Sequence, residues 1–262
     1  EQYCLFPQIW TPTIESTRRK GRSVIRKILY KMAWDTRCRN VDVARILRPF
    51  VNSDTTVLDA GCGEYGLSAF VDAKSVVGID ILPTDVKVDG FTFIHGSIIT
   101  LPFDEQSFTV AASVDVLEHL PVDLRATAIK QLVRVAKETI IITFPSGKAA
   151  REIDEDFNRE LVSSHQEVPD WLAEHLENPY PDADKVAEIV KTEAEKTGRK
   201  VKVTIQYSEN LTVARSLRKA ASTSKYLYLF GNLAAGFLLP LMPRASETNG
   251  YRAIILAEFI ND

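Results

Sequence analysis

The fold is decided by Val57-Leu-Asp-Ala-Gly-Cys-Gly-Glu-Tyr-Gly66, a short apolar run that ends in an acid and is followed by glycines spaced G-x-G-x-x-G. This order predicts a strand that turns sharply into a helix, with bare backbone where the two meet. Gly61 and Gly63 have no Cβ, so the chain can bend tightly there and a ligand can lie against the peptide groups. The amide groups at the start of the next helix would then face the polar end of that ligand.

Apolar segments alternate with helical stretches from about residue 55 to residue 145, which predicts a parallel sheet with crossover helices. The expected strands are 55–60, 75–81, 91–95, 108–113, 139–144, 200–207 and 252–259, and the expected helices are 122–137 and 183–197. Residues 146–183 lose this regularity and are acidic and polar. We therefore predict a basic helical cap (1–50), an α/β domain (51–209 and 251–262, with 146–183 on its acceptor side) and an apolar insert or lid (210–250).

The composition is that of a globular chain, with 262 residues, 45% hydrophobic residues, 26% charged residues and a formal net charge of -3. Proteins that live on nucleic acid usually carry a basic excess, so nucleic acid is not the expected partner. The three cysteines (Cys4, Cys38 and Cys62) show no C-x-x-C spacing, which predicts neither a disulfide framework nor a metal site. Without a basic-then-apolar leader at its start, the chain is expected in the cytoplasm.

Two acids indicate which nucleotide cofactor the glycine turn would serve. Asp80 ends the second expected strand, the place from which a carboxylate reaches a ribose diol. Asp59 stands directly before the glycines, where its charge would repel a pyrophosphate. It suits a ligand that presents a cation, such as the ammonium group of S-adenosylmethionine.

With these two acids in place, the sequence resembles the class I S-adenosylmethionine-dependent methyltransferases, particularly the type 11-like small-molecule group. The resemblance is carried by five blocks in the family's order: Val57-Leu-Asp-Ala-Gly-Cys-Gly63, Val77-Gly-Ile-Asp80, Gly96-Ser-Ile-Ile-Thr-Leu-Pro-Phe103, Asp104-Glu-Gln-Ser-Phe108 and Asp115-Val-Leu-Glu-His-Leu120. It implies a Rossmann-like α/β fold with a seven-stranded sheet that is mostly parallel, has an antiparallel last strand and carries a helical cap or insert.

The resemblance also implies where the cofactor S-adenosylmethionine would lie. Asp59, Gly61, Cys62 and Gly63 would surround its methionine end, and Asp80 would hold both ribose hydroxyls. The remaining implied contacts are Ile81 against the adenine, Ser97 and Ile98 beside it, and Ser113 with Val114 at the pocket floor. The family usually has an acid where this chain has Ser97, and a hydroxyl forms a weaker hydrogen bond to the adenine amine than a carboxylate does.

Methyl transfer from a sulfonium is an in-line displacement, in which an oxygen nucleophile of high pKa benefits from a nearby base. His119 follows the fourth strand, close to where the methyl group would point, and alternatively fixes the strand-to-helix turn. His165 is a second candidate base, and nearby Glu167 and Trp171 could bind a sugar through polar contacts and ring stacking. Alternatively, Trp171 packs against a core edge, and His175 is expected to face solvent.

Two segments could select the acceptor. Residues 18–48 are strongly basic and could meet a sugar diphosphate, an anionic lipid headgroup or RNA, or could form a solvated helix face. Residues 226–243 are the most apolar stretch and predict a lid or a dimer helix, or else peripheral membrane docking. Together with 163–182 they loosely resemble methyltransferases of polysaccharide pathways.

The favoured function is methyl transfer to a small-molecule, glycan-linked or lipid-linked hydroxyl. RNA methylation by the basic N-terminal face and a non-catalytic binding role are the alternatives.

Overall fold

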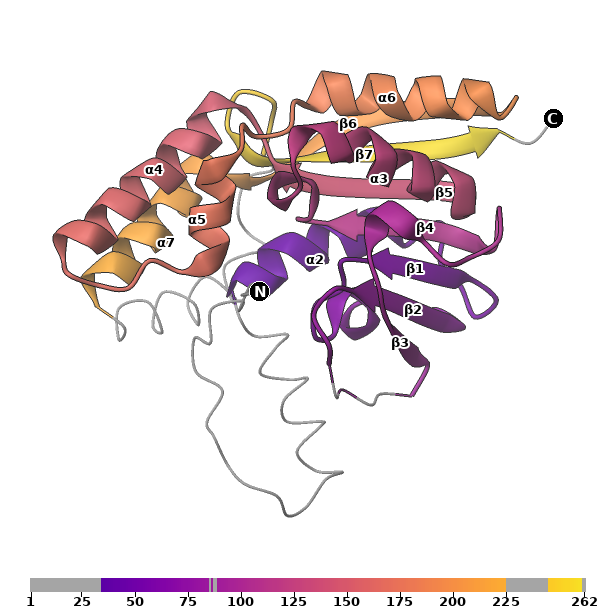
Figure 1. Ribbon diagram of the computed structural model, residues 1–262, viewed down its shortest axis with the longest axis horizontal. Coiled ribbons are helices and arrows are strands. Elements are labelled where there is room, and N and C mark those ends of the chain that lie inside the picture. Colours follow the sequence, from indigo (N-terminus) through magenta and orange to yellow (C-terminus); the bar gives the residue numbers. More distant parts are fainter. Residues whose placement is uncertain (1–33, 85, 87–88, 225–244, 261–262) are drawn as a thin grey trace, which may run out of the picture.

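The computed structural model describes residues 34–84, 86, 89–224 and 245–260, which form one seven-stranded sheet flanked by helices (Figure 1). The strands are β1 (Thr56–Ala60), β2 (Ser75–Asp80), β3 (Phe91–His95), β4 (Phe108–Val114), β5 (Ala136–Pro145), β6 (Lys200–Asn210) and β7 (Gly250–Ile260). The α-helices are α2 (Trp34–Leu47), α3 (Val122–Val135), α4 (Gly147–Ser163), α5 (Asp170–Glu177), α6 (Ala183–Lys196) and α7 (Leu211–Thr223). The 3-10 turns are η1 (Gly66–Ala69), η2 (Ile98–Thr100) and η3 (Leu117–His119).

The sheet has the order β3-β2-β1-β4-β5-β7-β6. Strands β1 to β5 pair in parallel, and β7 is antiparallel to both of its neighbours, β5 and β6. The predicted Rossmann-like sheet with an antiparallel last strand is therefore confirmed. The strand order reverses between β1 and β4, and ligands of open α/β sheets bind beyond the carboxyl ends of the strands at such a point.

The strands β1, β4, β5 and β7 bury both of their faces, whereas β3 and β6 at the two ends of the sheet are largely half-buried. Along β1, Leu58 and Ala60 join a core cluster with the apolar side of α3, whereas Val57 joins a second cluster with Leu47 of α2 and Leu67 of η1. Figure 1 shows α3 and α6 lying along the same face of the sheet. Burial on both faces explains why these strands appear in the sequence as continuous apolar runs.

Three helices, α4, α5 and α7, pack together beyond the carboxyl ends of the central strands (Figure 1). Residues 146–183, where the alternation of strands and helices stops, contain α4 and α5. Four side chains of α4 at helical spacing are buried, namely Ala150, Ile153, Phe157 and Leu161. Charged residues between these positions obscure the period in the sequence.

The glycine turn also differs from its prediction. In place of a regular helix after β1 there is a single 3-10 turn, η1. The amide groups near a ligand therefore come from a compact turn and not from the amino end of a long helix.

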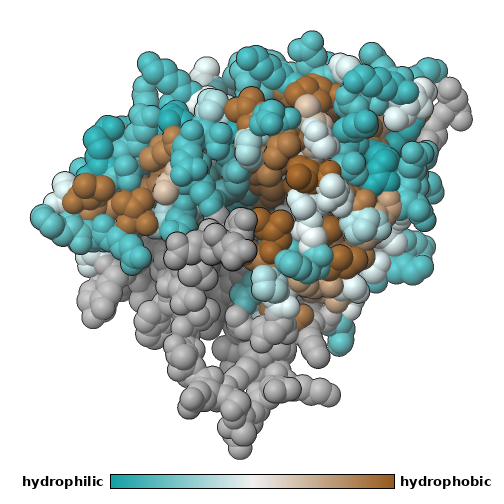
Figure 2. Space-filling view, in the orientation of Figure 1, coloured by the Kyte–Doolittle hydropathy of each residue, from teal (hydrophilic) through white to brown (hydrophobic). Residues whose placement is uncertain are grey.

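Several predicted features fall outside the described residues. Most of the basic cap (1–33) and the apolar stretch 226–243 are among them, so a lid, dimer or membrane role for 226–243 stays a prediction. Of the helices that are described, none is both long and apolar enough to cross a bilayer. The face in Figure 2 is hydrophilic around most of its outline, with hydrophobic side chains in a central band.

Candidate functional site

The backbone of the turn after β1 adopts conformations that favour glycine. Gly61, Gly63 and Gly66 have φ values of +85°, +56° and +46°. A Cβ on Gly61 would lie 2.2 Å from a methyl carbon of Val116, whereas a Cβ on Gly63 would meet no atom within 4 Å. Gly63 therefore presents bare backbone to open space, as expected for a peptide group against which a ligand lies.

Asp59 lies beneath this turn and is almost completely buried, with 1% of its surface exposed. Its Oδ2 accepts a hydrogen bond of 2.7 Å from the backbone N–H of Leu67. Its Oδ1 is buried with no hydrogen-bond partner among the described residues. Burial, opposed by the Leu67 hydrogen bond and assisted by the nearby charge of Asp80, raises the pKa of Asp59 to about 7. A buried carboxylate with an open oxygen favours a cationic partner.

Asp80 connects the glycine turn to the end of β2. Its Oδ2 accepts a 2.8 Å hydrogen bond from the N–H of Gly63, and its Oδ1 accepts a 2.9 Å hydrogen bond from the N–H of Leu82. Each oxygen keeps a further lone pair that could accept a hydrogen bond from a hydroxyl group. The next residue, Ile81, is 55% exposed, which is unusual for a large apolar side chain beside a buried acid.

Cys62 supports the turn from below. Its thiol is buried, donates to the carbonyl oxygen of Gly63 at 3.3 Å and fills the space above Gly78, where a Cβ would lie 2.5 Å from the sulfur. Burial raises the pKa of the Cys62 thiol, and the charges of Asp59 and Asp80 raise it further. Cys62 is therefore a packing residue that stays protonated.

The other implied contacts lie at the same edge of the sheet. Ser97 begins η2, and its Oγ accepts a long 3.4 Å hydrogen bond from the N–H of Ile99, while Ile98 is buried. Ser113 and Val114 end β4 and are buried, and the Oγ of Ser113 has no hydrogen-bond partner in the described part of the chain. The strand ends thus bring these residues, Asp59 and Asp80 to one edge.

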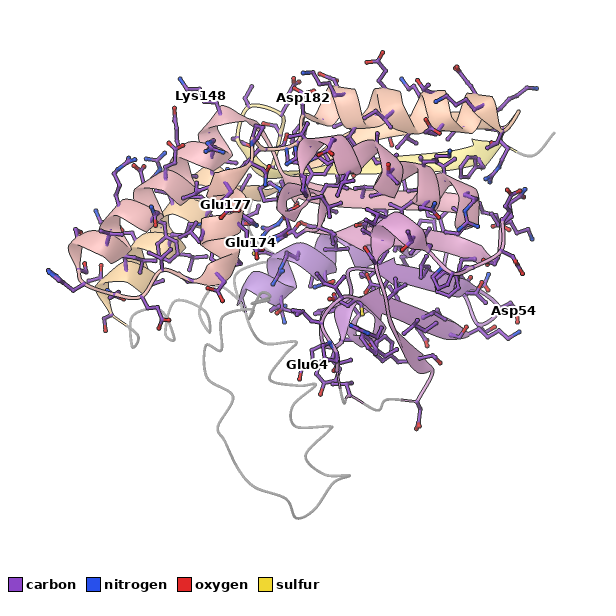
Figure 3. The ribbon with its side chains drawn as sticks, viewed as in Figure 1. Asp54, Glu64, Lys148, Glu174, Glu177 and Asp182 are labelled. Atoms are coloured by element: carbon purple, nitrogen blue, oxygen red, sulfur yellow. The ribbon has the colours of Figure 1, made fainter. Side chains whose placement is uncertain are left out.

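A second cluster of polar side chains lies just after β4, where η3 contacts α5. His119 Nδ1 lies 2.7 Å from Glu174 Oε2, and His119 Nε2 lies 3.3 Å from His175 Nε2. Figure 3 labels Glu174 on α5. The expectation that His175 faces solvent is wrong, because only 6% of its surface is exposed. The contact between His119 and His175 could not be predicted from the local sequence, because the two residues are 56 positions apart.

Asp154 of α4 contacts this cluster through His175. Its Oδ2 accepts hydrogen bonds from the hydroxyl groups of Tyr180 and Tyr251, the latter at 2.6 Å, and its Oδ1 lies 2.8 Å from Arg218 Nε. His175 Nδ1 lies 3.4 Å from Oδ2. Burial alone would raise the pKa of Asp154, but Arg218, His175 and Tyr180 together lower it to about 2. Asp154 is therefore an ionised anchor that joins α4, α5, α7 and β7.

A buried ion-pair cluster lies beside it at the strand ends. Arg252 of β7 donates from Nε to Asp115 at 2.6 Å and also pairs with Glu209 at the end of β6. Asp115 accepts a further 3.0 Å hydrogen bond from Thr143 of β5. These contacts fix the loop after β4, from which His119 projects.

The structure separates His165 from His119. His165 is exposed in the turn after α4, with φ +54°. It lies eleven positions beyond Asp154, and the nine helical steps from Asp154 to Ser163 alone span about 14 Å. Glu167 is also exposed, whereas Trp171 is half-buried and stacks on Phe157 with ring centroids 6.4 Å apart. That contact is the packing alternative expected for Trp171, and its role in sugar binding stays a prediction.

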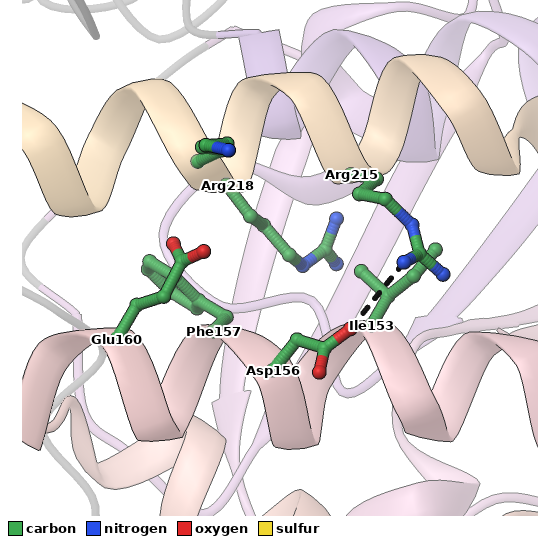
Figure 4. A pocket seen from close by; sticks show the side chains of 7 residues that line it. Ile153, Asp156, Phe157, Glu160, Arg215 and Arg218 are labelled. Carbon is green, nitrogen blue, oxygen red and sulfur yellow. Dashed lines mark hydrogen bonds and ion pairs between the residues drawn. The ribbon is translucent and has the colours of Figure 1, made fainter.

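Two hollows occur elsewhere. One, of about 150 Å³, lies between α4 and α7 and contains an ion pair of 3.4 Å between Asp156 and Arg215 (Figure 4). It is small compared with typical ligand pockets, which measure about 300–1,000 Å³. The other, of about 490 Å³, is an open groove between the start of α4 and residues 177–182, near Lys148, Glu177 and Asp182 in Figure 3. Neither is lined by residues of the glycine turn.

Part of this chain is similar to known methyltransferases. Residues 58–143 match a family model described as a methyltransferase domain. A curated protein of Encephalitozoon cuniculi (strain GB-M1), whose name suggests a methyltransferase, is 35% identical over 138 residues. The match covers 49% of this chain and 61% of that protein, so the chain spans about three fifths of this relative's length.

Among solved structures, a chain from the complex of the Haloferax volcanii Trm112 methyltransferase activator with a methyltransferase matches with a TM-score of 0.52 and 15% identity. The match covers 92% of this chain and 96% of that one. The geranyl diphosphate C-methyltransferase of Streptomyces coelicolor A3(2), solved with S-adenosyl-L-homocysteine, matches with a TM-score of 0.48 and 12% identity, over 84% of this chain and 77% of that one. This chain is therefore similar to methyltransferase domains over residues 58–143, within the seven-stranded sheet described above.

Proposed function

We propose that this chain transfers a methyl group from S-adenosylmethionine to a hydroxyl group of a small molecule or of a glycan-linked or lipid-linked acceptor. The observation that carries the proposal is the buried carboxylate of Asp59, whose Oδ1 has no hydrogen-bond partner in the described chain and lies beneath a turn of bare glycine backbone. S-adenosylmethionine offers a cationic amino-acid end, a ribose diol and an adenine, which match the groups gathered here.

The residues at the strand ends fit this cofactor. Asp59 would attract its ammonium group, and the backbone of Gly61 and Gly63 would border its methionine end. Asp80 would accept hydrogen bonds from the ribose hydroxyls, and exposed Ile81 would cover the adenine. Smaller contributions come from Cys62, Ser97, Ile98, Ser113 and Val114, which complete the walls. When bound, the cofactor supplies an electrophilic methyl group.

His119 is the residue of the second cluster that we place on the acceptor side. Burial, together with the nearby His175 and Arg39, lowers its pKa to about 3, so the imidazole is neutral at physiological pH. A neutral imidazole with so low a pKa is a weak proton acceptor. In this proposal His119 orients the acceptor hydroxyl, and catalysis rests mainly on alignment with the methyl group. His165 stays a separate prediction for the base.

The RNA alternative depends on the basic segment 18–48, of which only residues from 34 onward are described. Two of its arginines there already face acids: Arg45 lies 2.7 Å from Asp42, and Arg39 lies 3.9 Å from Asp115. These two arginines are therefore paired with acids of the protein itself, which reduces the positive charge that this segment offers to RNA. The hydroxyl acceptor is therefore the function that we favour.

Calorimetry with S-adenosylmethionine and with S-adenosylhomocysteine tests the cofactor site. We expect binding to the wild type and to Asp54→Asn, and a large loss in Asp59→Asn. Asp54 is an exposed acid just before the other end of β1, so it is a matched control (Figure 3). Absence of binding at millimolar ligand would leave only the non-catalytic alternative.

Transfer of a labelled methyl group then separates the acceptor classes. Purified glycans, lipid-linked sugars, small phenols and RNA are offered in parallel to the wild type and to Asp59→Asn. Label in the RNA fraction alone would favour the alternative function. Label in a hydroxyl compound that disappears in Asp59→Asn supports the proposal.

A further inference from the structure

Three side chains that can bind a metal ion meet after β4. One potential ligand atom from each of Glu118, His119 and His175 lies within 4.8 Å of the others. Glu118 has no exposed surface, and neither of its carboxylate oxygens has a hydrogen-bond partner in the part of the chain that is described. A buried carboxylate without a hydrogen bond is costly, and although Arg252 and Arg39 act on Glu118 electrostatically, both of its oxygens stay open to a further partner.

The outer atoms of both imidazoles show how they are oriented. Nδ1 of His119 lies 2.7 Å from Glu174 Oε2, and Nδ1 of His175 lies 3.4 Å from Asp154 Oδ2. A carboxylate can only accept a hydrogen bond, so each Nδ1 carries the hydrogen and each Nε2 keeps a lone pair. Both Nε2 lone pairs are then available to a metal ion. Histidines that bind metals are commonly held by carboxylates in this way.

The separations match a metal site. Two ligands at 2.0–2.1 Å from a tetrahedral zinc ion lie roughly 3.3 Å apart. The two Nε2 atoms are 3.3 Å apart, and Glu118 Oε1 lies 3.7 Å from Nε2 of His175. A small rotation of the Glu118 side chain would complete three corners of a tetrahedron.

We propose that Glu118, His119 and His175 bind one divalent transition-metal ion of the zinc class. Two imidazole nitrogens and one carboxylate form a donor set that zinc uses in sites with one open position. The side chain of His119 is 21% exposed, whereas those of Glu118 and His175 are 0% and 7% exposed, so the open position lies on the side of His119. The proposal departs from the expectation of no metal site, which considered only the spacing of the cysteines.

The site also suggests a use, which rests on the proposed function. An acceptor hydroxyl at the open position would have its pKa lowered by the metal and would release its proton to solvent more readily. This would supply an activated oxygen without a histidine base, and His119 would then orient the acceptor hydroxyl through the metal ion that it helps to hold.

Metal binding can be tested without any assay of methyl transfer. The untagged chain is stripped with a chelator, its folding is checked by circular dichroism, and it is titrated with Zn²⁺ and, separately, with Co²⁺. We expect one equivalent of Zn²⁺ to remain after gel filtration, and Co²⁺ to show the visible absorption of four-coordinate sites. His119→Ala and Glu118→Gln should each lower the affinity by at least about 100-fold.

Two further variants sharpen the test. Glu174 is half-buried and would contact the metal ligand His119, not the metal itself. Glu174→Gln should therefore lower the metal affinity about 10- to 100-fold, and it remains informative if the substitutions at buried positions impair folding. His165→Ala, which removes an exposed histidine outside the cluster, should leave metal affinity unchanged. Less than half an equivalent of Zn²⁺ in the wild type, or equal affinity in the wild type, His119→Ala and Glu174→Gln, would overturn the proposal.

Calorimetry with S-adenosylmethionine on the same preparations separates this proposal from the proposed function. Cofactor binding without metal binding refutes the metal site alone. Metal binding without cofactor binding refutes the methyl-transfer proposal and leaves the metal site supported.

Discussion

Replacing Asp59 by Asn is expected to stabilise the protein while it weakens cofactor binding. Burial raises the pKa of this carboxyl from 3.8 to about 7. At 1.36 kcal/mol for each pKa unit, an ionised Asp59 costs the folded state about 4 kcal/mol above pH 7. Asparagine has no charge to bury and keeps an oxygen that can accept the hydrogen bond from Leu67.

The effect has a defined pH dependence. Between about pH 4 and pH 7 the unfolded chain releases the Asp59 proton, whereas the folded chain retains it because its pKa is higher. The wild type therefore loses stability as pH rises through this window, and changes little above it. Since Asp59→Asn lacks this titration, its advantage over the wild type should grow by about 2–3 kcal/mol from pH 5 to pH 8.

Urea unfolding at pH 5 and pH 8 measures the difference, with Asp54→Asn as the control for loss of an exposed charge. Calorimetry at pH 8 should show about 10- to 150-fold weaker binding of S-adenosylmethionine to Asp59→Asn, because a hydrogen bond to a charged group contributes about 1.5–3 kcal/mol. A variant that is less stable than the wild type at pH 8, or an advantage that is constant with pH, would refute the reasoning.

Three other substitutions test neighbouring features. Gly66→Ala would place a Cβ 2.0 Å from Asp59 Oδ2 at positive φ, so thermal unfolding should show a loss of about 2 kcal/mol or more. Gly63→Ala has free space and should cost only about 1–2 kcal/mol, yet calorimetry should show loss of cofactor binding; equal stability losses in the two variants would contradict this. Arg252→Met leaves two buried carboxylates without their closest partner and should cost about 3–5 kcal/mol in urea unfolding, and a loss below about 1 kcal/mol would argue against the ion-pair cluster.

The sheet and the cofactor edge could be predicted because their signals are local. Doubly buried strands appear as apolar runs, and the expected strand 108–113 lies within β4. Asp59 and Asp80 lie at or near the carboxyl ends of β1 and β2, and these two strands pair in parallel, so the topology of the sheet places the acids together. The depth to which Asp59 is buried could not be predicted, because it depends on the return of the chain through η1.

The second cluster could not be predicted because its contacts are distant in sequence. His175 lies 21 positions after Asp154 and 56 after His119, and only the packing of α5 against η3 and α4 brings them together. The local pattern around His175 suggested an exposed helix face. Its neighbours on other elements instead bury it, which no short sequence window records.

The place of β7 in the sheet constrains how the protein emerges from a ribosome. Among the described strands, β6 pairs only with β7, and β7 lies between β5 and β6 in the sheet. The ribosome nevertheless makes β6 some forty residues before β7. Until residue 260 is available, the nascent chain carries two open strand edges, one on β5 and one on β6. We expect translation intermediates of this chain to need protection by chaperones, and the sheet to be completed only after β7 has left the ribosome.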